Sequence, residues 1–282
     1  MAAEGAFYLS CAVTSLVAII LDLPPIIHPV ICLTAGTITG ILVTSIPAYL
    51  KVKWHANELV SSLMLNYICL YMATYLIRTM VLDTTLGITC SVNFRETARL
   101  PNLIPSTRIH LGMIFVILAV IICWLIMYRT KLGYAVRMTG ENRHFAKYAG
   151  IGVGGTVMLA QVIGGALAGF GGANEMIGNY TRFQYQGLTQ YGFDGMIIAI
   201  IAKYNPALVP LAAIFLSYIR IGADIMNRTS DVPMEIISVI QSVIIMLVVA
   251  KMFLHKYMHR KIVEHSQSEL KEKEASMNAT GI

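Results

Sequence analysis

Apolar residues occur along this chain in long runs, separated by shorter stretches that are rich in charged residues, proline and glycine. A helix needs about 20 mainly apolar residues to cross the hydrocarbon core of a bilayer, and several runs reach this length. The predicted membrane segments are residues 6–21, 27–49, 57–77, 111–128, 152–172, 191–206, 207–221 and 233–253. The pattern therefore predicts an all-α fold, a polytopic helical membrane protein with about eight membrane segments.

The composition supports a membrane protein and argues against two other classes. Hydrophobic residues make up 56% of the 282 residues and charged residues only 13%, whereas soluble domains carry about 25% charged residues. The net charge is +6, but the basic residues lie in loops and in the tail, so we expect no nucleic-acid partner. The five cysteines form no C-x-x-C pair, so we expect neither a metal site nor a disulfide framework.

The distribution of basic residues predicts which loops face the cytoplasm, where Lys and Arg accumulate. If the tail lies inside and the segments alternate backwards from it, 14 of the 21 Lys and Arg residues fall on the cytoplasmic side. The connection 80–110 then lies outside, where it either seats a partner or forms a passive lid. We therefore expect a multi-pass plasma-membrane protein, with a transmembrane domain at 1–253 and a cytoplasmic, disordered tail at 254–282.

The longest polar interruption in the second half of the chain is the stretch 137–151, RMTGENRHFAKYAGI. It is predicted to contain a short helix bounded by Gly140 and Gly150, with Asn142 as its N-cap. Ala146 and Tyr148 are expected on the faces of this helix. Such a helix, held between two spans, would pass force between a soluble partner and the membrane. An ordinary solvated loop is the alternative.

Four residues are candidates for lining a path through the membrane. Asn66 is an amide at mid-helix depth, which must find a hydrogen-bond partner between helices or in a wet cavity. Asp194 opens a short, glycine-broken apolar segment, a pattern that points to a site in transporters. Glu4 also precedes a glycine and an apolar run, and both acids either face a wet cavity or cap helices. Phe193 supplies a ring for stacking. The glycines of 152–172 indicate close helix packing or a thin wall beside the path.

The two halves of the chain contain similar sequence patterns in the same order. In the first half, the pair E-G is followed by two apolar segments and then by N-E-L-V-S-S-L-M. A similar order occurs in the second half, where D-G is followed by two segments and then by M-E-I-I-S-V-I-Q. Glu4 then corresponds to Asp194, and Glu58 to Glu235. Because the two trios start on opposite sides in the predicted topology, we expect an inverted repeat, a common build for transporters.

The motifs of common enzymes and of ATPases are missing from the sequence. It has no G-x-x-x-x-G-K-[S/T], so ATP is not expected to bind to this chain through a P-loop. It has no H-E-x-x-H, no nucleophile elbow and no paired intramembrane carboxylates at helical spacing, so no catalytic residue is expected. The residues alone leave two transport classes open. One is a self-sufficient secondary carrier or channel, and the other is an importer driven by a separate ATPase.

Three stretches carry a resemblance to a known family. They read G-E-N-R-H-F-A-K-Y-A-G-I at 140–151, N-E-L-V-S-S-L-M-L-N-Y at 57–67 and E-T-A-R-L-P-N-L-I-P-S-T-R-I-H-L-G at 96–112. From about residue 3 to residue 250 the chain resembles permeases of ABC importers of the sugar and nucleoside uptake group, the branched-chain amino acid/ribose permease-like family. The sequences of these stretches are most similar to those of nucleoside-type permeases. In that family A-E-G follows an earlier span, so one or two further N-terminal helices are expected.

The resemblance implies a role for the stretch 129–151 as a cytoplasmic coupling loop. The residues implied to shape a helix that docks on an ATPase are Gly140, Glu141, Asn142, Ala146, Tyr148 and Gly150. The implied partners are that ATPase, which would bind ATP and magnesium, a second permease subunit in a homo- or heterodimer, an extracytoplasmic solute-binding protein and membrane lipid. The implied solute is a nucleoside, with simple sugars such as ribose next.

Overall fold

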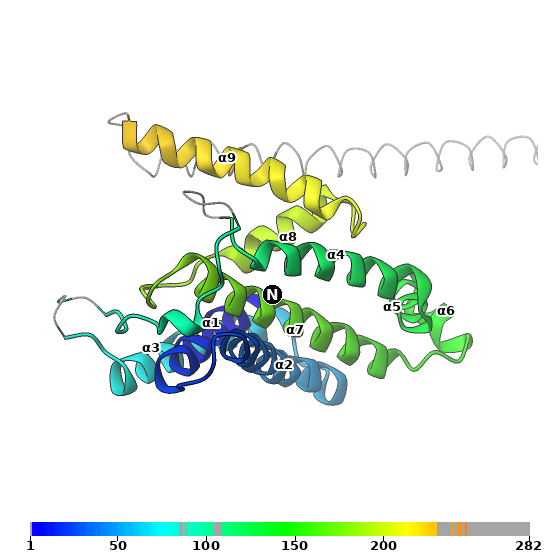
Figure 1. Ribbon diagram of the computed structural model, residues 1–282. Helices are drawn as coiled ribbons and strands as arrows, with labels where there is room; N and C mark the ends of the chain where they lie inside the picture. Colours follow the sequence, from blue (N-terminus) through cyan, green and yellow to red (C-terminus); the bar gives the residue numbers. More distant parts are fainter. Residues whose placement is uncertain are drawn as a thin grey trace, which may run out of the picture. The chain divides into compact units, whose positions relative to one another are not determined.

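The computed structural model describes residues 2–84, 87, 89–103 and 109–229, together with 239, 242, 243 and 246 (Figure 1). The chain divides into two compact units, Met1–Met196 and Ile197–Ile282. The predicted tail 254–282 lies outside the described residues, as do all but four residues of the predicted segment 233–253.

The described residues form helices joined by connections of very different lengths. The first unit contains α1 (Ala3–Ile20), α2 (Ile27–Trp54), α3 (Glu58–Met80), a 3-10 turn η1 (Glu96–Ala98), α4 (Gly112–Arg129), α5 (Lys131–Glu141), α6 (Arg143–Tyr148) and α7 (Val153–Asn179). Helix α8 (Tyr191–Ile201) runs from the first unit into the second, which also contains α9 (Val209–Thr229). In the described part of the chain there is no β-strand, only two isolated bridges. The predicted all-α fold is confirmed.

Five of the described helices, α1, α2, α3, α4 and α7, are long and apolar enough to cross a membrane. Each coincides with a predicted segment, so the polytopic membrane class is confirmed. Helix α8 and the apolar part of α9 are shorter. Helix α8 ends at Ile201 rather than at 206, because Lys203 and Tyr204 turn the backbone into the left-handed region, with φ of 50° and 57°. The count of about eight spans and the inverted repeat stay predictions.

Helix α1 is the most buried of the spanning helices. It contacts α2, α3 and α7. In its apolar 18-residue stretch 67% of the residues are buried, compared with 6% in the corresponding stretch of α4. Its buried hydroxyls bond to backbone carbonyls, as Ser10 Oγ does to Gly36 O at 2.8 Å. Small side chains with internally satisfied hydroxyls let three helices approach α1 closely.

Helices α2 and α7 touch through glycines spaced four residues apart on each helix. A Cβ atom added to Gly40 of α2 would lie 2.2 Å from Gly165 O, and one added to Gly169 of α7 would lie 2.3 Å from Gly36 O. No side chain fits at those positions, so the close-packing interpretation is confirmed for these glycines. Gly171, on the same helix, has open space instead.

The connection after α3 folds over the end of the helix bundle at which α1 ends and α2 begins. Arg95 Nη1 pairs with Asp22 at 2.7 Å, and the ring of the buried His28 contacts Thr97 Oγ1 at 2.9 Å. The backbone of Phe94 also donates to Thr181 O at 2.8 Å. We call this end of the first unit the Arg95 end. The opposite end, where α2 ends and α3 begins, is the Lys51 end.

Candidate functional site

The carboxylate of Glu4 lies where the first turn of α1 meets the start of α8. The residue is fully buried. Its Oε1 accepts hydrogen bonds from Gln190 N at 2.6 Å and Thr189 Oγ1 at 3.1 Å, and its Oε2 accepts one from Gly192 N at 2.6 Å. The first N–H groups of a helix lack intrahelical partners and carry partial positive charge, so a carboxylate stabilises them. Glu4 therefore ties α1 to the start of α8.

The side chain of Asn66 binds the first turn of α1 in a similar way. It is 1% exposed, and its Oδ1 accepts a hydrogen bond from Gly5 N at 2.9 Å. A Cβ on Gly5 would lie 2.9 Å from Asn66 Cα, and a Cβ on Gly192 would lie 2.9 Å from Glu4 Cα. Both contacts thus depend on glycine. Of the two environments predicted for Asn66, the structure places it in a contact between helices.

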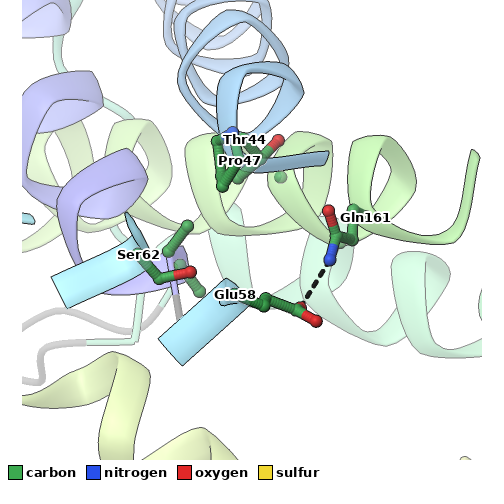
Figure 2. A pocket seen from close by; sticks show the side chains of 9 residues that line it. Thr44, Pro47, Glu58, Ser62 and Gln161 are labelled. Atoms are coloured by element: carbon green, nitrogen blue, oxygen red, sulfur yellow. Dashed lines mark hydrogen bonds between the residues drawn. The ribbon is translucent and has the colours of Figure 1, made fainter. Parts of the chain in front are cut away.

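Two cavities flank the start of α1, and Ala3 lines both. The first, which we call the polar cavity, has a volume of about 160 Å³ and lies between α1, α2, α3 and α7. Its polar lining comes from Thr44, Glu58, Ser62 and Gln161, whose side chains are seen in Figure 2. The rest of its wall consists of alanine, glycine and proline.

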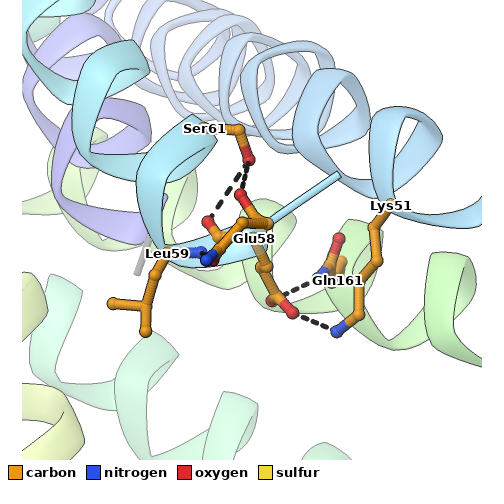
Figure 3. Close-up of polar contacts among 6 residues, drawn as sticks. Lys51, Glu58, Leu59, Ser61 and Gln161 are labelled. Carbon is orange, nitrogen blue, oxygen red and sulfur yellow. Dashed lines mark hydrogen bonds and ion pairs between the residues drawn. The ribbon is translucent and has the colours of Figure 1, made fainter. Parts of the chain in front are cut away.

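A chain of polar contacts joins three helices beside the polar cavity. Glu58 Oε2, on α3, pairs with Lys51 Nζ at the end of α2 (Figure 3). Glu58 Oε1 accepts a hydrogen bond from Gln161 Nε2, on α7, at 2.5 Å. The side chains of Lys51 and Glu58 are 25% and 38% exposed, so the ion pair contributes only about 0–1 kcal/mol of stability. The main effect of the contacts of Glu58 is to orient its two partners, Lys51 and Gln161.

The orientation of the Gln161 amide follows from these contacts. An ionised carboxylate only accepts hydrogen bonds, so the NH₂ group must face Glu58 and the amide oxygen must face away from it. That oxygen, Oε1, is buried and has no hydrogen-bond partner in the described part of the chain. In Figure 2 it lies on the side of the amide that is nearer to Thr44. Leaving such an acceptor unsatisfied costs about 1–3 kcal/mol.

The second cavity, which we call the aromatic cavity, has a volume of about 330 Å³. Phe7 of α1 and Tyr191 of α8 line it, with their ring centroids 5.4 Å apart in an edge-to-face arrangement. Gly192 and Gly195 form a side chain-free part of its wall. This arrangement suits a flat or apolar group.

The four predicted path residues lie around these cavities without lining either of them. Glu4 and Asn66 are buried in the helix contacts described above. Phe193 and Asp194 are half-buried in the first turn of α8. Their role in a path stays a prediction.

Two residues at the cavities, Gln161 and Tyr191, were not singled out from the sequence as site residues. A signal for Gln161 was present, because it is an isolated amide in the apolar run 152–172. A polar residue in a spanning helix needs a partner, and this one finds Glu58. Tyr191 gave no such signal, because tyrosine is common at the ends of membrane segments.

The predicted loop 129–151 forms two helices, α5 and α6, rather than one. Asn142 separates them and caps α6, since its Oδ1 accepts hydrogen bonds from His144 N at 3.0 Å and Phe145 N at 3.1 Å. The predicted N-cap is therefore confirmed. Gly150 ends the motif with φ of 77°. Gly140 was wrongly predicted as a boundary: it lies inside α5, which also contains Glu141 as its last residue.

Ala146 and Tyr148 differ in their surroundings, although both were expected on faces of the short helix. Ala146 is fully buried, and its carbonyl accepts a hydrogen bond from Ile151 N at 2.9 Å. Tyr148 is 92% exposed and Phe145 is 52% exposed. Helix α6 contacts α5 and α7, so Ala146 packs inside the loop while the two aromatic rings remain open to a partner.

Comparisons with known proteins point to membrane transport. The family described as "Branched-chain amino acid transport system / permease component" matches residues 2–249. The guanosine ABC transporter permease protein NupP of Bacillus subtilis is 34% identical over 231 residues, which cover 80% of this chain and 66% of NupP. The nucleoside ABC transporter permease protein NupB of Lactococcus lactis is 30% identical over 241 residues, which cover 82% of this chain and 65% of NupB.

A third relative is named as a permease for glucose. The glucose ABC transporter permease protein TsgB13 of Haloferax volcanii is 28% identical over 265 residues, which cover 90% of this chain and 70% of TsgB13. The chain thus spans about two thirds of the length of these curated relatives. No solved structure is significantly similar to it. Because the family match extends over residues 2–249 of 282, this membrane-embedded chain belongs to the family of branched-chain amino acid transport system permease components.

Proposed function

We propose that this chain is the membrane-spanning permease subunit of an ABC importer and provides the translocation path for a nucleoside or a simple sugar. The observation that carries this proposal is the family match over residues 2–249. The relatives are named as permeases for guanosine, nucleosides and glucose, which are neutral solutes rich in hydroxyl groups. The polar cavity suits such a solute, because Lys51 offsets the charge of Glu58 and the other polar lining is uncharged.

The proposal includes three partners. A cytoplasmic ATPase binds ATP with magnesium and hydrolyses it, a second permease subunit completes the path, and an extracytoplasmic solute-binding protein delivers the solute. In this proposal the Lys51 end faces the cytoplasm, because it carries Lys51 and Lys53 and basic residues accumulate on that side. Helix α7 starts at this end, since a Cβ on Gly154 would meet Val52, so α5 and α6 face the ATPase. The proposal also includes a transmembrane permease domain at 1–253 and a cytoplasmic tail at 254–282, and the Arg95 end faces the binding protein.

Uptake by reconstituted vesicles tests this function. The chain, purified with its ATPase and second permease subunit, is placed in liposomes and supplied with binding protein, ATP and labelled guanosine or glucose. We expect uptake of one of these solutes that depends on ATP inside the vesicle. Uptake by the chain alone, without an ATPase or ATP, would instead identify a self-sufficient carrier or channel and contradict the proposal.

Replacing Tyr148 with alanine is expected to uncouple ATP hydrolysis from uptake. Tyrosine is enriched among the few interface residues whose truncation costs about 2 kcal/mol or more, so the uptake per ATP hydrolysed should fall about tenfold or more. The fold should be retained, because the ring is 92% exposed. The measurement is uptake and ATP hydrolysis in the same vesicles.

Two further variants of the same loop serve as controls for Tyr148. Tyr148→Phe keeps the ring and should behave as the natural protein does. Ala146→Glu places an acid at a fully buried position and should reduce the amount of folded protein instead. If Tyr148→Ala keeps the natural ratio of uptake to ATP hydrolysis, α6 does not dock through this ring.

A further inference from the structure

We propose that the polar cavity is a binding site for a sugar hydroxyl of the solute, and that Gln161 Oε1 accepts a hydrogen bond from that hydroxyl. The inference rests on the proposed function and deepens it, because it names the chemical group that is recognised and the atom that recognises it. The relatives' names state solutes but no residues.

The first observation is that the acceptor is held in place before any solute arrives. Lys51 forms an ion pair with Glu58, and Glu58 accepts a hydrogen bond from the NH₂ group of Gln161. These contacts come from α2, α3 and α7, so three helices fix one amide (Figure 3). The amide oxygen is left buried and without a partner in the described part of the chain. Gln161 is among the residues that line the polar cavity, and an acceptor that lacks a partner is suited to a ligand donor.

The second observation concerns charge. Glu58 is the charged residue in the lining of this cavity, and Lys51 pairs with it. An anionic solute would meet the carboxylate, and a cationic solute would compete with Lys51. A neutral donor is therefore favoured, and a hydroxyl group is such a donor. Ser62, which is 2% exposed, adds a hydroxyl to the lining that is able to donate or accept.

The third observation is the size of the site. The cavity of about 160 Å³ is well above the roughly 10–15 Å³ that a cavity needs to hold one water molecule. Its other walls are small or rigid, namely alanine, glycine and Pro47. A space of this size is able to hold a hydroxylated group such as one sugar ring. The site therefore recognises the hydroxylated part of the solute.

Binding of paired solutes to purified protein tests this inference without an ATPase. Guanosine and 2′,3′-dideoxyguanosine differ by two ring hydroxyls. We expect millimolar guanosine to raise the unfolding temperature of the natural protein more than the dideoxy analogue does. In Gln161→Met, which keeps the side-chain length but removes the amide, the two solutes should have the same effect. Gln184→Met, at an exposed loop position, is the matched control and should retain the difference.

Uptake by the assembled transporter gives a second measurement. Loss of one hydrogen bond should lower the rate of guanosine uptake by Gln161→Met about fivefold to tenfold, and leave dideoxyguanosine uptake unchanged. An equal loss for both solutes would mean that Gln161 only supports the helix contact, and the proposal would be wrong. It would also be wrong if the natural protein did not distinguish the two solutes in binding. A binding difference without ATP-driven uptake would keep the cavity and reject the importer function.

Discussion

Replacing Glu4 with alanine is expected to release the start of α8 from α1 and to lower the stability of the protein. Two backbone N–H groups and one hydroxyl lose their acceptor, the buried carboxylate of Glu4. A donor left unsatisfied costs about 1–3 kcal/mol when it is fully buried. These three donors are partly buried, so we expect about 1 kcal/mol from each and roughly 3 kcal/mol in all. Gln190 adopts φ of 63°, a conformation that a residue other than glycine keeps only when its surroundings hold it. The segment around Gln190 should therefore exchange its amide protons faster.

The measurements for Glu4→Ala are the unfolding temperature in detergent and hydrogen exchange over residues 189–194. Glu175→Ala is the matched control, because that acid bonds Asn179 of its own helix α7 at 2.9 Å. It should change neither quantity strongly. Glu4→Gln keeps one acceptor oxygen and should lie between the natural protein and Glu4→Ala. If Glu4→Ala and Glu175→Ala behave alike, the carboxylate does not hold α8.

Replacing Gly169 with alanine is expected to force α2 and α7 apart. The new methyl group would lie 2.3 Å from Gly36 O and 3.0 Å from Gly40 Cα. These are backbone atoms, which cannot rotate away, so the two helices must separate. Overpacking usually costs about 1–3 kcal/mol, and we expect a loss at or above the upper end of this range. The polar cavity is lined by both helices, so solute binding should fall as well.

The control for Gly169→Ala lies two residues further along α7. An alanine at Gly171 would meet nothing within 4 Å, and alanine favours a helix over glycine by up to about 1 kcal/mol. Gly171→Ala should therefore fold as well as the natural protein or better. The measurements are the yield of monodisperse protein and its unfolding temperature. Equal yields and unfolding temperatures for the two variants would mean that α2 and α7 are not in close contact.

The features that the sequence determined by itself are those that depend on neighbouring residues. The length of an apolar run decides whether a helix is able to span a bilayer, so α1, α2, α3, α4 and α7 were predicted. The cap at Asn142 also followed from the sequence, because a side-chain oxygen at that position reaches N–H groups two and three residues ahead. The need of Asn66 for a partner was predictable in kind, since an amide in a spanning helix must be paired.

The tertiary structure alone decided which distant residues meet. Glu4 Oε2 accepts a hydrogen bond from Gly192 N, 188 positions along the chain. Gln161 donates a hydrogen bond to Glu58, 103 positions away. No local pattern encodes such pairs, because they depend on how whole helices pack. The same holds for Ala146, since α6 has only six residues and is too short to reveal a buried face by its periodicity. It also holds for the glycines of α7, where only the approach of α2 separates Gly169, which has no room for a methyl group, from Gly171, which has room.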